Sequence, residues 1–346
     1  MPPTDPDRVV ILVHGKFPDR AKTALGILRY ADYDVVAVLD RETAGSRVND
    51  HVPDVADAPI VASMADAPAC DTLIVGIAPI GGGFEEAWRP DVRTALERGC
   101  DVVAGLHYFL AEDEEFADLA ERHGSDLWDV RRPPGDLGVA EGVADVVDAA
   151  VALTVGTDCS TGKMTTTMEL ARAARERGID AAVVPTGQTG ILIEGWGIAV
   201  DRVISDFAAG AVERMILREA DRDLLLVEGQ GSIVHPAYSG VTTSILHGAM
   251  PDALVLCHVA GREAIHGYED TGIPDPETYV DLYESLAAPV HEAEVAAGAL
   301  ATHGIGEVGE ARDAIEGFGD AIDAPATDPV RFDADVLVEG IMDALD

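Results

Sequence analysis

The fold is decided by the stretch Val151-Ala-Leu-Thr-Val-Gly-Thr-Asp-Cys-Ser-Thr-Gly-Lys163. The apolar run at 151–155 predicts a buried strand, Gly156 and Gly162 bracket a loop, and a helix is expected to begin at Lys163. A strand, a glycine loop and a helix in this order form an anion cradle, because backbone N–H groups and a lysine converge there. The stretch therefore predicts an α/β fold that binds a phosphorylated ligand.

The cradle departs from the usual phosphate loop in two ways. Five residues, and not four, separate its glycines, and Met164 stands where a serine or threonine normally ligates magnesium. The longer spacing resembles the loop of the dethiobiotin-synthetase-like branch of phosphate-loop proteins. Thr165 or Thr166 is the loop's candidate magnesium ligand, should a metal be used, and Thr165 is the one assigned here. The residues predicted to bind a cofactor here are Gly156, Thr157, Asp158, Cys159, Ser160, Thr161, Gly162, Lys163, Met164 and Thr165.

Short apolar runs alternate with amphipathic segments along the whole chain, which predicts an α/β protein with parallel sheets. A length of 346 residues favours two domains. Prolines in the segment 131–136 indicate a linker, so the domains are expected at 1–135 and 139–346. Strands are expected at 9–13, 35–39, 72–77, 101–104, 151–155, 181–185, 224–227, 253–257 and 295–301. Helices are expected at 19–30, 91–98, 113–123, 163–177, 207–220 and 277–287.

The chain is strongly acidic, with 63 Asp and Glu against 24 Lys and Arg and a formal net charge of −39. The acids are spread evenly and 47% of the residues are apolar, which predicts a folded protein and not a disordered one. At about 1 M salt the Debye length falls to roughly 3 Å, which screens repulsion among surface carboxylates. We therefore expect adaptation to a salty cytoplasm and no nucleic-acid partner. Neither a signal peptide nor a membrane span is predicted.

Glu228 and His235 are the candidate catalytic residues. The run at 224–227 predicts a buried parallel strand, and Glu228 follows at its carboxyl end, where ligands bind in α/β sheets. A carboxylate there can take a proton or hold magnesium. His235 precedes a proline, and its interpretation stays open between a base, a ligand contact and a structural residue.

Other strand ends carry candidate contacts. Arg262 and Arg331 would supply positive potential for an anionic ligand in this acidic chain. Asp328 is suited to read a base or ribose, and Asp206 either caps a helix or reaches an ammonium group or metal. The cofactor candidates of this kind are His258, Arg262 and Asp328. The substrate candidates are His107, Gln188, Thr189, Asp206 and Arg331.

The cysteines are scattered and form no CxxC pair, and the histidines form no HExxH motif, so no zinc site is predicted. Cys159 could act as a nucleophile, but no base stands beside it in the sequence, so we interpret it as a loop residue. The contiguous glycines Gly81–Gly83 only weakly favour an NAD-dependent oxidoreductase.

Taken together, these motifs resemble the D-glutamate N-acetyltransferase-like family over nearly the whole chain. The resemblance implies a Rossmann-like N-terminal domain, a P-loop NTPase-like C-terminal domain, and acetyl transfer from acetyl-CoA to the amine of D-glutamate. It also suggests a homo-oligomer. It rests on Gly105-Leu-His107, Asp129-Val-Arg-Arg-Pro-Pro134, Gly156 to Thr165, Pro185-Thr-Gly-Gln-Thr-Gly190, Asp206-Phe, Glu228-Gly-Gln-Gly231 with His235-Pro236, and Thr327-Asp-Pro-Val-Arg331.

The loop fits acetyl-CoA independently, because its amides and Lys163 can hold the coenzyme phosphates without hydrolysing them. Met164 argues against a magnesium-dependent NTPase, which needs Ser or Thr at this position to ligate the metal. It does not argue against coenzyme binding, which needs no such ligand. The alternative function is an ATP- and magnesium-dependent ligase, carboxylase or kinase. A further alternative is a nucleotide-sensing module without turnover.

Overall fold

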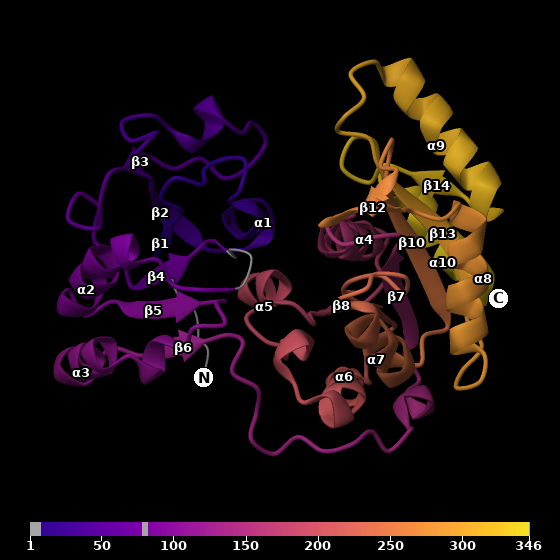
Figure 1. Ribbon diagram of the computed structural model, residues 1–346, viewed down its shortest axis with the longest axis horizontal. Helices are drawn as coiled ribbons and strands as arrows, with labels where there is room; N and C mark the ends of the chain where they lie inside the picture. The colour runs from indigo at the N-terminus through magenta and orange to yellow at the C-terminus, as the bar shows by residue number, and fades with distance from the viewer. Residues whose placement is uncertain (1–7, 78–81, 346) are drawn as a thin grey trace. The chain divides into compact units, whose positions relative to one another are not determined.

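The computed structural model describes residues 8–77 and 82–345, so Gly81 of the predicted glycine turn lies outside the described residues. The chain folds into two compact units (Figure 1). The N-terminal unit comprises Met1–Pro133 and Gln188–Arg202, and the C-terminal unit comprises Pro134–Gly187 and Val203–Asp346. The sequence predicted one boundary near 135–139 and did not anticipate that residues 188–202 pack with the N-terminal unit.

The N-terminal unit is built on a six-stranded parallel sheet within the described residues, in the order β3-β2-β1-β4-β5-β6. This is the order of a Rossmann fold, whose topological switch point lies between β1 and β4. Its strands are β1 (Arg8–Leu12), β2 (Asp34–Leu39), β3 (Ile60–Val61), β4 (Thr72–Val75), β5 (Asp101–Ala104) and β6 (Leu127–Asp129).

The helices of this unit include one that the sequence analysis placed in a loop. The helices are α1 (Lys22–Tyr30), α2 (Arg89–Glu97), α3 (Glu114–His123) and α5 (Gln188–Glu194). Asp113 caps α3 by accepting from the amides of Glu115 and Phe116, and Gly124 ends it at φ +70°. The loop expected at 185–190 ends at Gly187, because the apolar residues of α5 are buried and α5 packs on α1.

The C-terminal unit contains a second six-stranded parallel sheet within the described part of the chain, in the order β14-β13-β10-β7-β9-β8. Strand β7 lies inside the sheet, and its residues from Val151 on are buried, as expected for a parallel strand covered on both faces. The strands are β7 (Ala150–Gly156), β8 (Ala181–Val184), β9 (Leu224–Val227), β10 (Ala253–Val259), β13 (Glu294–Ala301) and β14 (Ala326–Thr327).

Two groups of helices pack on this sheet. Helices α4 (Lys163–Glu176) and α10 (Asp335–Leu345) pack on each other and on the sheet. The second group comprises α6 (Ser205–Arg218), α7 (Ser239–Ala249), α8 (Pro276–Ala287) and α9 (Val308–Ile322). Within it α6 packs on α7, α7 on α8 and α8 on α9. A hairpin of β11 (Ala264–Ile265) and β12 (Tyr268–Gly272) follows β10. In the described residues no helix combines the length and apolarity that a membrane span requires.

The sequence analysis missed α7, α9, α10 and β14, although α9 buries apolar residues at helical spacing, namely Ala311, Ile315, Phe318 and Ile322. It also placed the start of α6 two residues late. The helix begins at Ser205 with Ile204 in the cap position, and no side chain caps it, so neither Ser205 nor Asp206 is the cap. Short 3-10 turns occur at Val48–Asp50, Glu86–Trp88, Leu110–Glu112, Ala144–Val146 and Val200–Arg202.

Candidate functional site

The predicted cradle forms between the central strand and the first helix of the C-terminal unit. Strand β7 ends at Gly156 and α4 begins at Lys163, as the sequence predicts. Gly162 adopts φ +93° just before the helix, a left-handed conformation that favours glycine. Thr157 and Asp158 are fully buried, whereas Ser160 is exposed. The loop is therefore anchored at its start and open at its tip.

Two tyrosines that the sequence analysis missed hold the start of the loop. The hydroxyl of Tyr279 donates to the carbonyl oxygen of Thr157 at 2.7 Å, and that of Tyr283 to the carbonyl of Gly156 at 2.8 Å. Both side chains are fully buried, and burial raises the pKa of Tyr283 to about 12. They share one face of α8 because they are four residues apart. This Tyr-x3-Tyr spacing on a predicted helix is the sequence signal from which the two tyrosines could have been found.

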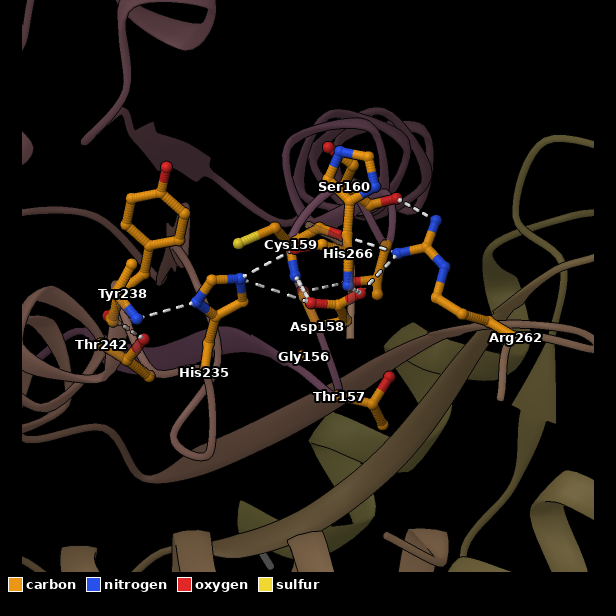
Figure 2. A network of polar contacts seen from close by, with 12 residues as sticks. Gly156, Thr157, Asp158, Cys159, Ser160, His235, Tyr238, Thr242, Arg262 and His266 are labelled. Carbon is orange, nitrogen blue, oxygen red and sulfur yellow. Dashed lines mark hydrogen bonds and ion pairs between the residues drawn. The ribbon is translucent and has the colours of Figure 1, made fainter. Parts of the chain in front are cut away.

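Asp158 connects the loop to the β11–β12 hairpin (Figure 2). Its Oδ1 accepts from the Cys159 amide at 2.7 Å. Its Oδ2 accepts from Arg262 Nη1 at 3.1 Å and from the His266 amide at 2.9 Å. Arg262 also donates to the Cys159 carbonyl at 2.6 Å and to the Ser160 carbonyl at 3.3 Å. Arg262 thus compensates a buried carboxylate and fixes the loop backbone, while its predicted contact with a cofactor stays a prediction.

Lys163 lies over the same loop. Its ammonium donates to the carbonyl oxygen of Asp158 at 2.8 Å and to the hydroxyl of Thr161 at 3.2 Å, and the side chain is 6% exposed. A buried ammonium beside the backbone amides of the loop is suited to bind an anion.

Glu228 lies at the carboxyl end of β9, as predicted. Its side chain is 6% exposed and accepts from the Gly187 amide at 3.1 Å. The Thr186 hydroxyl donates to the Glu228 carbonyl at 2.6 Å, which ties the ends of β8 and β9 together. The next residue, Gly229, donates its amide to the Thr154 hydroxyl at 3.0 Å. The fold therefore brings Glu228 to the sheet edge at which β7 also ends.

His235 is 2% exposed, and its hydrogen bonds define its tautomer. Its Nδ1 accepts from the Ala237 amide at 3.1 Å, so in the neutral ring the proton sits on Nε2. Nε2 faces the His266 carbonyl at 3.4 Å and Asp158 Oδ1 at 3.9 Å. This geometry makes Nε2 a hydrogen-bond donor.

Asp158, Cys159 and His235 form the one group of three potential metal ligands among residues 8–77 and 82–345, with ligand atoms within 4.8 Å of one another. A metal on His235 Nε2 would move the proton to Nδ1, which normally donates to a carbonyl or carboxylate. Here the Ala237 amide already donates to Nδ1. The group therefore does not fit a metal. Thr165 and Glu228 remain the predicted magnesium ligands.

His258 positions the loop from the end of β10. Its Nδ1 and the Thr157 hydroxyl are 2.7 Å apart, and its ring stacks on Phe318. Burial, reinforced by the nearby Arg262 guanidinium, lowers the pKa of His258 to about 4. The side chain is consequently neutral at pH 7.

Asp328 and Arg331 form hydrogen bonds with neighbouring residues of the chain. Asp328 Oδ2 accepts from the amide and hydroxyl of Thr302, and Oδ1 accepts from the amides of Val330 and Arg331. The Arg331 guanidinium donates to the carbonyl oxygens of Ile305 and Gly306. Both side chains therefore fasten the loop after β14, and their predicted ligand contacts are untested.

In the N-terminal unit, His107 and Gln188 lie around one arginine. Arg131 donates to Gln188 Oε1 at 2.7 Å and pairs with Asp201. His107 Nε2 is 3.7 Å from Asp201 Oδ2, and burial, then Arg131, lowers the pKa of His107. These predicted substrate residues thus share an ion-pair network.

Thr189 and Asp206 are the remaining substrate candidates. The Thr189 hydroxyl lies 2.9 Å from that of Thr23, while Asp206 is exposed in the first turn of α6.

The fold and site together define a two-domain α/β protein that joins a Rossmann-like unit to a P-loop unit. Residues 41–133 match the Rossmann-like domain DUF1611_N, and residues 138–338 match the P-loop domain DUF1611_C, both described as domains of unknown function. The chain belongs to the DUF1611 family, which includes relatives named D-glutamate N-acetyltransferase, and this confirms the family resemblance.

Three relatives show how far the similarity extends. A D-glutamate N-acetyltransferase of Tritonibacter scottomollicae is 38% identical over 278 residues, covering 80% of this chain and 83% of its own. One of Pseudoalteromonas is 35% identical over 270 residues, covering 78% and 81%. A crystal structure of a DUF1611 family protein from Anabaena variabilis is 39% identical, with a TM-score of 0.92 over 97% of this chain and 99% of its own.

Proposed function

We propose that this chain is an amino-acid N-acetyltransferase that transfers the acetyl group of acetyl-CoA to the amine of D-glutamate or a similar amino acid. The observation that carries this proposal is the 35–38% identity to two relatives of that name over about four fifths of the chain. The anion cradle supports it, because both substrates are anionic.

In this proposal the loop holds the coenzyme phosphates. Acetyl-CoA carries a pyrophosphate and a 3′-phosphate, and loop amides with a buried lysine suit either. Met164 replaces the usual magnesium ligand, which such binding does not need.

Acetyl transfer needs a base for the substrate ammonium and donors for the thioester oxyanion. We assign the base to Glu228, a buried carboxylate at a strand end. His235 was the second candidate base, but its Nε2 carries the ring proton and faces Asp158 of the loop, so we propose no proton-accepting role for it. The amides of residues 229–231 are the proposed oxyanion donors.

An amine screen with acetyl-CoA in high salt, followed by free thiol, tests this function. We expect thiol release with D-glutamate and a slower reaction with L-glutamate as the matched control. Absence of thiol release with every amine would contradict the proposal.

The alternative, an ATP- and magnesium-dependent ligase, carboxylase or kinase, is supported by the phosphate-loop position between β7 and α4. Calorimetry with acetyl-CoA and separately with Mg-ATP discriminates the two. Tight Mg-ATP binding without coenzyme binding would favour the alternative.

Glu228→Gln tests the assigned base. The amide keeps the size of the side chain but cannot take a proton, so kcat should fall by about 100-fold or more while KM for acetyl-CoA changes little. Steady-state kinetics measures both values. An unchanged kcat would remove Glu228 from the mechanism.

A further inference from the structure

Two cysteines that are scattered in the sequence meet at one edge of the N-terminal sheet. The sulfurs of Cys70 and Cys100 are 3.5 Å apart, and both thiols are reduced. Cys70 lies two residues before β4, and Cys100 lies immediately before the neighbouring parallel strand β5. Both cysteines are therefore at the amino ends of their strands, opposite the carboxyl edge at which ligands of α/β sheets bind.

The backbone holds the two cysteine segments beside each other. The amide of Asp101 donates to the carbonyl oxygen of Asp71 at 2.9 Å, and these two residues directly follow the cysteines. The Cys100 thiol also donates to the Cys70 carbonyl oxygen at 3.2 Å. The sulfurs of a disulfide are about 2.05 Å apart, so closing this pair requires them to approach by about 1.5 Å. Rotation of the two side chains can supply that movement while the strands stay paired.

Arg98 connects the same two segments. Its guanidinium donates to the carbonyl oxygen of Met64 at 2.6 Å and to that of Pro68 at 2.8 Å. Arg98 stands two residues before Cys100. Pro68 stands two residues before Cys70. One side chain thus ties together the stretches of backbone that lead into the two cysteines, and the thiols are held together before any bond forms between them.

This pair of thiols does not fit a metal site. Zinc takes three or four protein ligands. Among residues 8–77 and 82–345, neither cysteine belongs to a group of three potential ligands. A bond between the two sulfurs is the chemistry that two adjacent thiols can complete without a further protein group.

We infer that Cys70 and Cys100 are a redox modification site, at which a reversible disulfide links the start of β4 to the start of β5. The oxidant is a small disulfide such as oxidised glutathione. Cys70, which is partly exposed, attacks it first, so that a mixed disulfide forms on Cys70 and one glutathione leaves. Cys100, which is 2% exposed, then attacks the Cys70 sulfur, so that the protein disulfide forms and the second glutathione leaves. The two glutathiones take up the two electrons and the two protons that the thiols give up.

The bond has a consequence for stability. It closes a loop that contains β4 and α2, and a closed loop restricts the unfolded chain. The oxidised chain should therefore resist unfolding better than the reduced chain. Because no step involves acetyl transfer, this inference is independent of the proposed function, and the failure of one leaves the other standing.

The test uses the full chain with Cys159→Ser, which removes the partly exposed thiol of the phosphate loop. Three of the four cysteines remain, namely Cys70, Cys100 and the fully buried Cys257. After treatment with oxidised glutathione, the thiols counted in denaturant should fall from three to one. Peptide mass spectrometry should find Cys70 joined to Cys100 and no glutathione attached, and dithiothreitol should restore both thiols.

Thermal melting in about 2 M salt measures the effect on stability. The oxidised chain should melt about 5–10 °C above the reduced chain. The matched control is Cys100→Ser in the same background. It should keep one glutathione on Cys70, because no second thiol displaces it, and its melting temperature should show no such rise.

Arg98→Gln tests whether the arginine holds the thiols together. Time-resolved mass spectrometry separates the addition of the first glutathione to Cys70 from its release on closure. We expect addition at the original rate and closure slowed about tenfold, which corresponds to the loss of one charged hydrogen bond. A variant that only loosened the fold would speed the addition instead, and would assign no positioning role to Arg98.

Three results would overturn the inference. They are a stable glutathione adduct on Cys70 with the Cys100 thiol unreacted, no reaction at either cysteine, and equal melting temperatures for the oxidised and reduced chains.

Discussion

At the scale of single residues, the cradle depends on a cation that this chain rarely uses. Lys163 is one of only three lysines, with Lys16 and Lys22. Lys163→Ala should weaken pyrophosphate and coenzyme binding by about 1.5–3 kcal/mol, the contribution of a charged hydrogen bond. Calorimetry measures this, with Lys22→Ala, an exposed residue of α1, as the control. Equal affinities for wild type and Lys163→Ala would mean that the loop is not the anion site.

His258 gives a residue-scale prediction about pH. Its folded pKa of about 4 lies below the ordinary value of 6.5, so between these values the unfolded chain binds more protons. Stability is therefore complete above about pH 6.5 and falls as the pH drops toward 4, by about 3 kcal/mol at most.

His258→Asn keeps an acceptor for the Thr157 hydroxyl but does not titrate. Denaturant unfolding from pH 7 to 4 should show a shallower loss of stability in this variant. Parallel pH profiles would show that His258 contributes nothing to acid sensitivity.

At the scale of elements, the backbones of β9 and β7 approach closely just after the end of their strand pairing, at Gly229. A Cβ on Gly229 would lie 1.7 Å from the Thr154 carbonyl oxygen. Gly229→Ala should therefore cost about 3 kcal/mol or more, because the backbone of β7 cannot move aside.

Gly240 provides a matched control for this element. It lies in the first turn of α7, and a Cβ there would meet no atom within 4 Å. Gly240→Ala should be neutral or stabilising by up to about 1 kcal/mol. Denaturant melts of both variants check the contrast, and equal effects would contradict the close approach.

At the scale of the whole molecule, charge dominates. With a net charge of −39, self-repulsion should destabilise the fold in dilute buffer. The melting temperature should rise between low salt and about 2 M salt. The rise should exceed ~2–4 °C, which is the shift that 1 kcal/mol of unfolding free energy produces in a unit of roughly 150–250 residues. Calorimetric scans at several salt concentrations measure this, and a salt-independent melting temperature would refute it.

The parallel α/β class and the P-loop were predictable because their signals are local, whereas the Rossmann-like N-terminal domain was implied only by the family resemblance. The run at 151–155, the two glycines and Lys163 are contiguous, and β7, the loop and α4 form where they predict. The apolar run before Glu228 likewise placed that carboxylate at the end of β9. Helix α9 was missed although its buried residues Ala311, Ile315, Phe318 and Ile322 recur at helical spacing, so its local signal was present in the sequence.

The sequence alone determined the strand–loop–helix cradle, the parallel α/β class and the family, because spacing and hydrophobic pattern along the chain encode them. Only the tertiary structure decided that Arg262 and His235 gather at Asp158 and Cys159, and that α5 packs with the N-terminal unit. Those contacts join residues far apart in the chain, so no local pattern encodes them: the cluster at Asp158 forms once β7 and β10 pair, and α5 is placed by its packing on α1.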